Sequence, residues 1–169
     1  MTGFINARFD ILMNGTNTGA NSDYRWEVSE RWLSIDENGR ILFERKPAEN
    51  ESRMVSVKAT HKQNGEIWTW SFTVETWFTG YNSQQLIWEA ARDYCNAQGL
   101  RLEERTELTT GTNIRTPGTL FSEWGSPTGY TYSGFMSSIS YSWTSSPERN
   151  GFYYQVLLSN GATTSNSTD

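Results

Sequence analysis

The stretch Val55-Ser56-Val57-Lys58-Ala59-Thr60 decides the fold class of the first part of the chain. Apolar residues alternate with polar ones at every second position, which places the two kinds on opposite faces of a β-strand. The alternation resumes beyond the Asn64-Gly65 turn, where Trp68, Trp70, Phe72 and Val74 face one way. The two stretches therefore predict neighbouring strands with one apolar face each.

The same period of two extends toward the N-terminus. It predicts strands at residues 7–13, 24–29, 32–36 and 40–43. Asn38-Gly39 is a strong hairpin signal, although the preceding Asp36-Glu37 favours a loop longer than two residues. With about six short strands and regular turns, residues 1–76 are predicted to form an all-β sandwich.

A helical pattern replaces the alternation beyond residues 76–82, so we place a domain boundary between 76 and 77. A helix over 83–98 is predicted, capped by Asn82 or Ser83 and ended by Gly99. A second helix is expected over 103–110 and a further turn from Thr116-Pro117 toward Trp124. Strands at 141–145 and 152–158 complete an α+β domain over 77–169, and the Thr/Ser-rich tail at 162–169 is expected to be loose at its end.

Charge and hydropathy exclude several partners. The net charge is −5 and the basic residues form no stripe, so nucleic acid is a poor partner. No apolar stretch approaches the roughly 18 residues needed to span a bilayer, so we expect no direct membrane insertion by this chain.

Residues that could support catalysis or metal binding are few. His61 is the only histidine, and neither a zinc spacing nor a phosphate or dinucleotide fingerprint is present. Glu103, Glu104 and Glu107 suit a first helical turn better than a calcium site. We therefore predict a protein that is not an enzyme and binds no metal or cofactor. A hydrolase that uses Glu103 and Glu123 as its paired carboxylates stays open as an alternative.

Aromatic residues are the conspicuous feature, with 8 Trp, 8 Tyr and 8 Phe. Most are predicted to fill the two cores: Trp26, Trp68, Trp70, Trp88 and Trp143. A second group lies in or beside the Gly/Ser-rich loop at 125–140: Trp124, Tyr130, Tyr132 and Phe135. These four either form an exposed protein-binding surface, with Trp124 as its main anchor, or hold the loop in place.

The order of several motifs resembles the C-terminal tip of intimin/invasin-family bacterial adhesins, the inverse autotransporters. Tyr24-Arg25-Trp26 and Trp32-Leu33-Ser34-Ile35-Asp36 resemble the family's bacterial immunoglobulin-like domain. Ala90-Ala91-Arg92-Asp93-Tyr94-Cys95-Asn96-Ala97-Gln98-Gly99 and Trp143-Thr144-Ser145 resemble its C-type lectin-like domain. The resemblance implies an immunoglobulin-like domain at 1–76 and a lectin-like domain at 77–169.

Such a tip is the extracellular part of an outer-membrane protein and binds a host or receptor protein without catalysis. A structural spacer in an adhesin rod is the alternative. Carbohydrate binding is disfavoured, because Ser146-Pro147-Glu148 and Trp143-Thr144-Ser145 replace the triplets of calcium-dependent lectins.

The resemblance also implies a partner for Cys95 in a final strand. Cys95 is the single cysteine and the sequence ends at Asp169 before any such strand. We therefore expect a free thiol at Cys95, and two alternatives stay open: the chain is cut before the final strand, or this family member lacks the disulfide. In the first case we expect dimers through that thiol or through strand exchange.

Overall fold

The computed structural model describes residues 1–81, 85–136 and 141–168. Contacts between Cα atoms divide the chain into two compact units. The first holds residues 3–78 with Met1, and the second holds the chain from Thr79 onward with Thr2. The sequence placed a domain boundary two residues earlier, and independent folding of each part stays a prediction.

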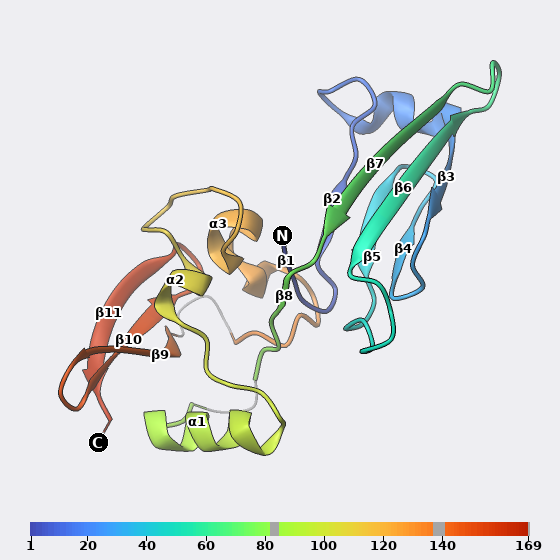
Figure 1. The fold of residues 1–169 in the computed structure, drawn as a ribbon. Helices are drawn as coiled ribbons and strands as arrows, with labels where there is room; N and C mark the ends of the chain where they lie inside the picture. The colour runs from blue at the N-terminus through green and yellow to red at the C-terminus, as the bar shows by residue number, and fades with distance from the viewer. Residues whose placement is uncertain (82–84, 137–140, 169) are drawn as a thin grey trace. The chain divides into compact units, whose positions relative to one another are not determined.

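Two antiparallel sheets of three strands make up the described part of the first unit (Figure 1). One has the order β2 (Arg8–Asp10), β5 (Arg40–Phe43), β4 (Leu33–Ile35), and the other β3 (Tyr24–Val28), β6 (Met54–His61), β7 (Ile67–Thr73). The short strands β1 (Thr2–Gly3) and β8 (Thr76–Trp77) pair with each other, and a 3-10 helix, η1, spans Thr18–Asp23. All six predicted strands are confirmed.

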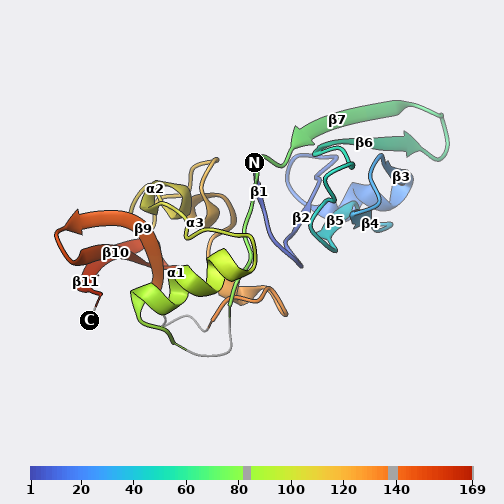
Figure 2. The same cartoon turned by 60° about the horizontal axis from the view of Figure 1, so that its bottom comes forward.

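The two three-stranded sheets pack face to face within this unit, as the turned view in Figure 2 also shows. Val55, Val57 and Ala59 on β6 are fully buried, which confirms the predicted inward face. The ring of Phe72 on β7 lies 5.6 Å from that of Phe9 and 6.2 Å from that of Phe43 on the opposite sheet. Apolar side chains from both sheets therefore share one core.

Trp68 does not belong to this core. It is 48% exposed, so the prediction that it fills the core is wrong. It lies on the same face of β7 as Trp70 and Phe72, but next to the turn at the start of the strand. A period of two identifies the face of a strand without saying how far along the strand the core extends.

The β4–β5 hairpin loop is longer than two residues, as predicted. The Gly39 amide donates to the Asp36 carbonyl at 3.1 Å, and Gly39 has a φ of +74°. A Cβ at Gly39 would lie 2.7 Å from Asn21 Nδ2 and 2.8 Å from the Trp26 ring. Glycine is therefore required here by its conformation and by the close approach of its neighbours.

The described part of the second unit combines short helices with one antiparallel sheet. The helices are α1 (Trp88–Ala97), α2 (Arg105–Leu108), α3 (Leu120–Trp124) and the 3-10 turn η2 (Pro127–Gly129). The sheet has the order β11 (Ala162–Ser167), β10 (Phe152–Leu157), β9 (Tyr141–Arg149). α1 packs against β9, and α2 packs against β9 and β10.

The helices are shorter than predicted. The expected start of the first helix at Asn82 or Ser83 lies outside the described residues, and α1 begins after Ile87. α2 begins at Arg105, not 103. The predicted start at Thr116-Pro117 is wrong, because Gly118 has a φ of +107°, which a right-handed helix does not allow.

The Thr/Ser-rich tail forms strand β11 over Ala162–Ser167, which the sequence did not predict. β11 pairs antiparallel with β10 from Phe152 opposite Ser167 to Leu157 opposite Ala162. Gly161, with a φ of +75°, supplies the turn between them. Hydrogen bonds to β10 stabilise a segment whose side chains show no apolar alternation.

Candidate functional site

Trp124 closes α3 and is buried, with 7% of its surface exposed. Its indole Nε1 donates to the hydroxyl of Thr2, in the same unit, at 2.9 Å. The expectation that Trp124 is the main anchor of an exposed surface is therefore wrong. A buried indole with its N–H satisfied is a packing residue.

Tyr130 also holds the loop in place. Its hydroxyl donates to the Trp124 carbonyl at 3.3 Å, and the two rings meet edge to face with centroids 6.1 Å apart. The ring is half-buried. The sequence left two interpretations open, an exposed binding surface or residues that hold the loop in place. The second describes Trp124 and Tyr130.

Tyr132 differs from both, since 87% of its surface is exposed. Its φ is +59°, in the left-handed region that a tyrosine rarely occupies. The Ser133 amide donates to the Tyr130 carbonyl at 3.1 Å, which makes Tyr132 the third residue of a tight turn, where glycine is usual. The backbone therefore presents this ring to solvent at a conformational cost of about 1–3 kcal/mol.

Phe135 is half-buried and lines a cavity of about 500 Å³ in the second unit. The end of the loop lies against residues 79–81, because a Cβ on Gly80 would collide with the Gly134 carbonyl. Of the four predicted residues, Trp124 and Tyr130 thus anchor the loop, the ring of Tyr132 is exposed, and Phe135 lines the cavity. The remainder of the predicted loop, 137–140, lies outside the described residues.

Aromatic side chains and one carboxyl characterise the described wall of this cavity. The wall comes from α1, β9, β10, β11 and the segments before α1 and α2. Among its members are Tyr81, Tyr94, Phe135, Tyr141, Trp143 and Glu103. Glu103 is the charged residue of the lining that the structure describes.

Glu103 lies in the segment before α2, not in its first turn as predicted. Glu104 and Glu107 occupy the N-cap and third positions of α2 and form its capping box. Burial raises the pKa of Glu103 to about 7. The main-chain carbonyl of Glu103 accepts a hydrogen bond from the Ser145 amide at 2.8 Å, which fixes this segment to β9.

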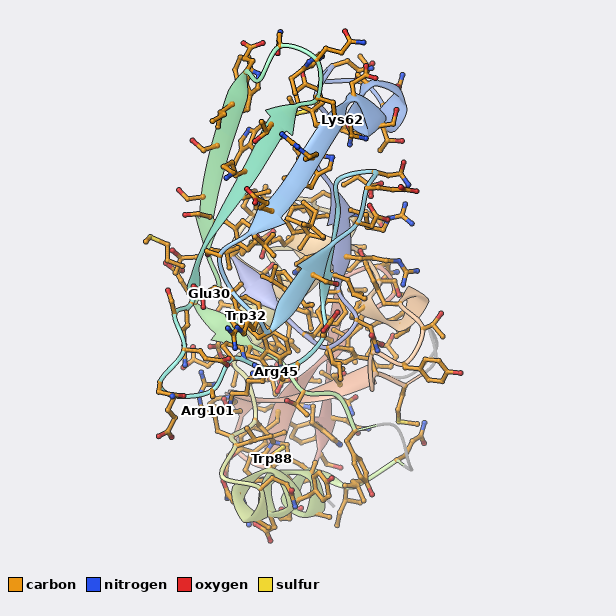
Figure 3. The ribbon with its side chains drawn as sticks, turned by 90° about the vertical axis from the view of Figure 1, so that its right-hand side faces the viewer. Glu30, Trp32, Arg45, Lys62, Trp88 and Arg101 are labelled. Carbon is orange, nitrogen blue, oxygen red and sulfur yellow. The ribbon has the colours of Figure 1, made fainter. Side chains whose placement is uncertain are left out.

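Two further contacts fix the elements around the cavity, and Figure 3 labels Trp88 on α1 and Arg101 on the segment that follows it. Trp88 Nε1 donates to the Thr144 carbonyl on β9 at 2.9 Å. Arg101 forms a two-point ion pair with Glu107, at 2.8 and 2.7 Å. Because this guanidinium is already paired with Glu107, the described residues leave the carboxyl of Glu103 without an ion pair.

Cys95 is a half-buried thiol that also lines the cavity. Burial raises its pKa, and the nearby charge of Glu103 raises it further. A thiol with a raised pKa is a weak nucleophile at neutral pH. Dimer formation through Cys95 stays a prediction.

Other polar candidates have structural contacts. The carboxylate of Glu123 accepts from the amide and the hydroxyl of Thr2 at 2.6 and 2.7 Å. His61 accepts from the Gln63 amide through Nδ1 at 3.2 Å and packs edge to face on Tyr24. The described residues contain no group of three His, Cys, Asp or Glu that could hold a metal ion.

No local pattern in the sequence predicted the aromatic cavity. Tyr94 belongs to an amphipathic pattern and Trp143 to a strand, so each is typical of a core residue when considered alone. Only the packing of α1 against β9 brings both to one wall together with Glu103.

Comparison with known proteins finds similarity to bacterial adhesins along nearly the whole chain. A family model described as "Invasin, domain 4" matches residues 1–72. The chain is also 27% identical over 161 residues to "Inverse autotransporter adhesin YeeJ" of Escherichia coli (strain K12), a match that covers 94% of this chain. The chain resembles the intimin/invasin family of adhesins, through the family model in its first part and through the relative over nearly its whole length. The predicted resemblance is confirmed.

This similarity places the chain in the extracellular part of a bacterial outer-membrane protein. The chain spans 7% of the length of the curated relative it matches. No solved structure matches it. Among the residues that the structure describes, none of the helices is long and apolar enough to cross a membrane.

Proposed function

We propose that this chain is a non-catalytic adhesin unit that binds a host or receptor protein through the loop of residues 125–136, with Tyr132 as its principal contact. Similarity to adhesins supports a role in adhesion and favours a non-enzymatic protein. We assign the contact to the loop of residues 125–136 and the partner to the class of host or receptor proteins.

The exposed ring of Tyr132 carries the proposal. The ring of Tyr132 is 87% exposed, and its left-handed backbone lowers the stability of the fold. Tyrosine is enriched at protein interfaces because its ring is large, rigid and able to donate a hydrogen bond. Binding a partner would bury a ring that the fold presents to solvent.

The architecture of a lectin-like tip is part of the same proposal. The face-to-face sheets of the first unit are compatible with an immunoglobulin-like domain over 1–76. The helices and antiparallel sheet of the second are compatible with a C-type lectin-like domain over 77–169. The loop of residues 125–136 belongs to the second.

A structural spacer is the second candidate. It is favoured by the small share of the relative, 7%, that this chain covers, since a long adhesin needs many units that only extend it. A spacer requires no exposed contact residue and predicts that the chain binds nothing on the host surface.

Binding of the fluorescently labelled chain to mammalian epithelial cells, measured by flow cytometry, separates these functions. We expect saturable binding that trypsin treatment of the cells abolishes and glycosidase treatment leaves intact, because the partner is a protein. Tyr132→Ala should weaken binding about tenfold or more, the effect of losing a central interface aromatic.

Trp68→Ala is the matched control, since it removes an exposed aromatic from the first unit. Its binding should equal that of the unmodified chain. Equal binding by Tyr132→Ala would refute the assignment to this loop. Absence of binding by the unmodified chain would favour the spacer.

A further inference from the structure

The cavity of about 500 Å³ in the second unit has a composition that suits a positively charged organic ligand. Its described wall carries five aromatic rings and one carboxyl group. Rings present a negative face to a cation, and a carboxylate adds a full opposite charge. Neither the adhesin family nor the proposed contact at Tyr132 accounts for this combination.

The aromatic wall comes from separate segments of the unit. Tyr94 lies on α1, Tyr141 and Trp143 on β9, Tyr81 before α1, and Phe135 at the end of the loop of residues 125–136. The rings of Tyr81 and Tyr94 lie with centroids 4.2 Å apart. Trp143 is held in place by its Nε1, which donates to the Leu86 carbonyl at 2.8 Å.

Glu103 is suited to receive a cation. The guanidinium of Arg101, whose charge acts on Glu103, is paired with Glu107. Among the described residues the Glu103 carboxyl forms no ion pair. A half-buried carboxyl without a cation lowers stability when ionised, and a bound cation would remove that cost.

We propose that this cavity binds an alkylguanidinium or alkylammonium group, with Glu103 accepting hydrogen bonds from its N–H groups and the surrounding aromatic rings contacting its charge. A cation bearing N–H donors fits better than a quaternary ammonium, because the carboxylate accepts hydrogen bonds. The proposal does not depend on protein binding by Tyr132.

N-Butylguanidinium is the probe, and N-butylurea, of similar shape but uncharged, is its control. Nuclear magnetic resonance titration of the full chain would follow the amides and indoles of the cavity wall. We expect saturable shifts with the guanidinium at about 10 mM or below, as befits a small ligand, and at least tenfold weaker binding of the urea.

Glu103→Gln keeps the shape of the side chain and removes its charge, so it should weaken guanidinium binding about tenfold or more. Asp93→Asn is the matched control: Asp93 is an exposed carboxylate on α1 outside the cavity lining, and its loss should leave the affinity unchanged. Equal affinity for guanidinium and urea, or unchanged affinity in Glu103→Gln, would overturn the proposal, as would the absence of saturable shifts in the unmodified chain.

The pH dependence provides a test on the unmodified chain. With its pKa raised to about 7 by burial, Glu103 is largely neutral at pH 6 and ionised at pH 8, so affinity should rise about tenfold over that range. Other titratable groups face the cavity from α1, from β9 and from the segment before α1: Cys95, Tyr94, Tyr141 and Tyr81. The thiol of Cys95 stays neutral over this range, since its pKa is raised. The charges of Arg101 and Glu107 also act on Glu103. An affinity independent of pH would exclude Glu103 as the acceptor.

A capped Gly-Arg-Gly tripeptide distinguishes the two sources of such a group. Tighter binding of the tripeptide than of N-butylguanidinium would identify a protein side chain as the ligand. Tighter binding of the free cation would identify a small metabolite. Either order supports a cation site, whereas binding of neither probe contradicts it.

Discussion

The hydroxyl of Tyr130 donates to the carbonyl of Trp124 at 3.3 Å while the two rings meet edge to face. One residue of the loop thus both caps the end of α3 and covers its buried indole. Because these two residues form the base of the loop, the exposed ring of Tyr132 rests on a fixed support. We therefore expect substitution of Trp124 to lower the stability of the second unit, and substitution of Tyr132 to weaken binding.

Trp124→Ala should destabilise the second unit by about 3–5 kcal/mol, the usual cost of removing a buried indole. The substitution also leaves the hydroxyl of Thr2 without its donor. Urea unfolding followed by circular dichroism measures the effect, with Trp124→Phe as a milder control. A loss below about 1 kcal/mol would show that Trp124 does not anchor the loop.

Tyr132→Gly should be more stable than Tyr132→Ala by about 1 kcal/mol. Both variants lose the ring, but only glycine adopts a φ of +59° without strain. Thermal unfolding of the two variants side by side provides the comparison. Equal stability would mean that the backbone at this position is not strained in solution.

The stability of the second unit should fall as pH rises from about 5 to 8, because of Glu103. Its pKa in the folded chain is about 7, above the roughly 4.3 of an unfolded glutamate. Between these values the folded state binds the extra proton, so the Glu103 contribution is complete below the lower value and is lost as pH passes the upper one. The loss should amount to about 1–3 kcal/mol.

Glu103→Gln should remove this fall, since a neutral amide does not titrate, whereas Asp93→Asn should retain it. Denaturant unfolding at several pH values checks both variants. A Glu103→Gln variant that still loses stability over the same range would assign the effect to another group.

Asn21→Ala should destabilise the first unit by about 2–4 kcal/mol, because it leaves buried backbone groups unpaired. The fully buried Asn21 amide donates to the Ile11 and Asn38 carbonyls, both at 2.6 Å, and accepts from the Met13 amide at 3.2 Å. Asn64→Ala, in an exposed turn, is the control and should cost below about 1 kcal/mol. Similar losses in both variants, measured by thermal unfolding, would contradict this role.

Local patterns predicted the strands of the first unit well, and β6 shows why. Its inward residues Val55, Val57 and Ala59 alternate with polar ones, and burial on one face of a sheet follows directly from that alternation. β11 escaped prediction because Thr, Ser and Asn carry no such pattern. Its strand conformation depends on pairing with β10, which no local stretch reveals.

The candidate site was less predictable, because its contacts join distant parts of the chain. Trp124 is buried with a hydrogen bond to Thr2, which is 122 positions away. The sequence pattern placed Glu103 in the first turn of a helix. In the structure Glu104 and Glu107 form the capping box, and Glu103 lies before the helix. Composition identified the aromatic loop of residues 125–136, but exposure, which only the fold determines, distinguishes Tyr132 from its neighbours.

Photo-crosslinking from Tyr132 tests the central proposal most directly. The ring would be replaced by p-benzoylphenylalanine in the chain bound to mammalian epithelial cells, and a matched chain would carry the same group at Trp68. We predict that illumination joins a trypsin-sensitive surface protein to position 132 and that unlabelled wild-type chain competes with this product, whereas position 68 gives none. Crosslinks from position 68 alone, or from neither position while the chain remains bound, would contradict binding through the loop of residues 125–136.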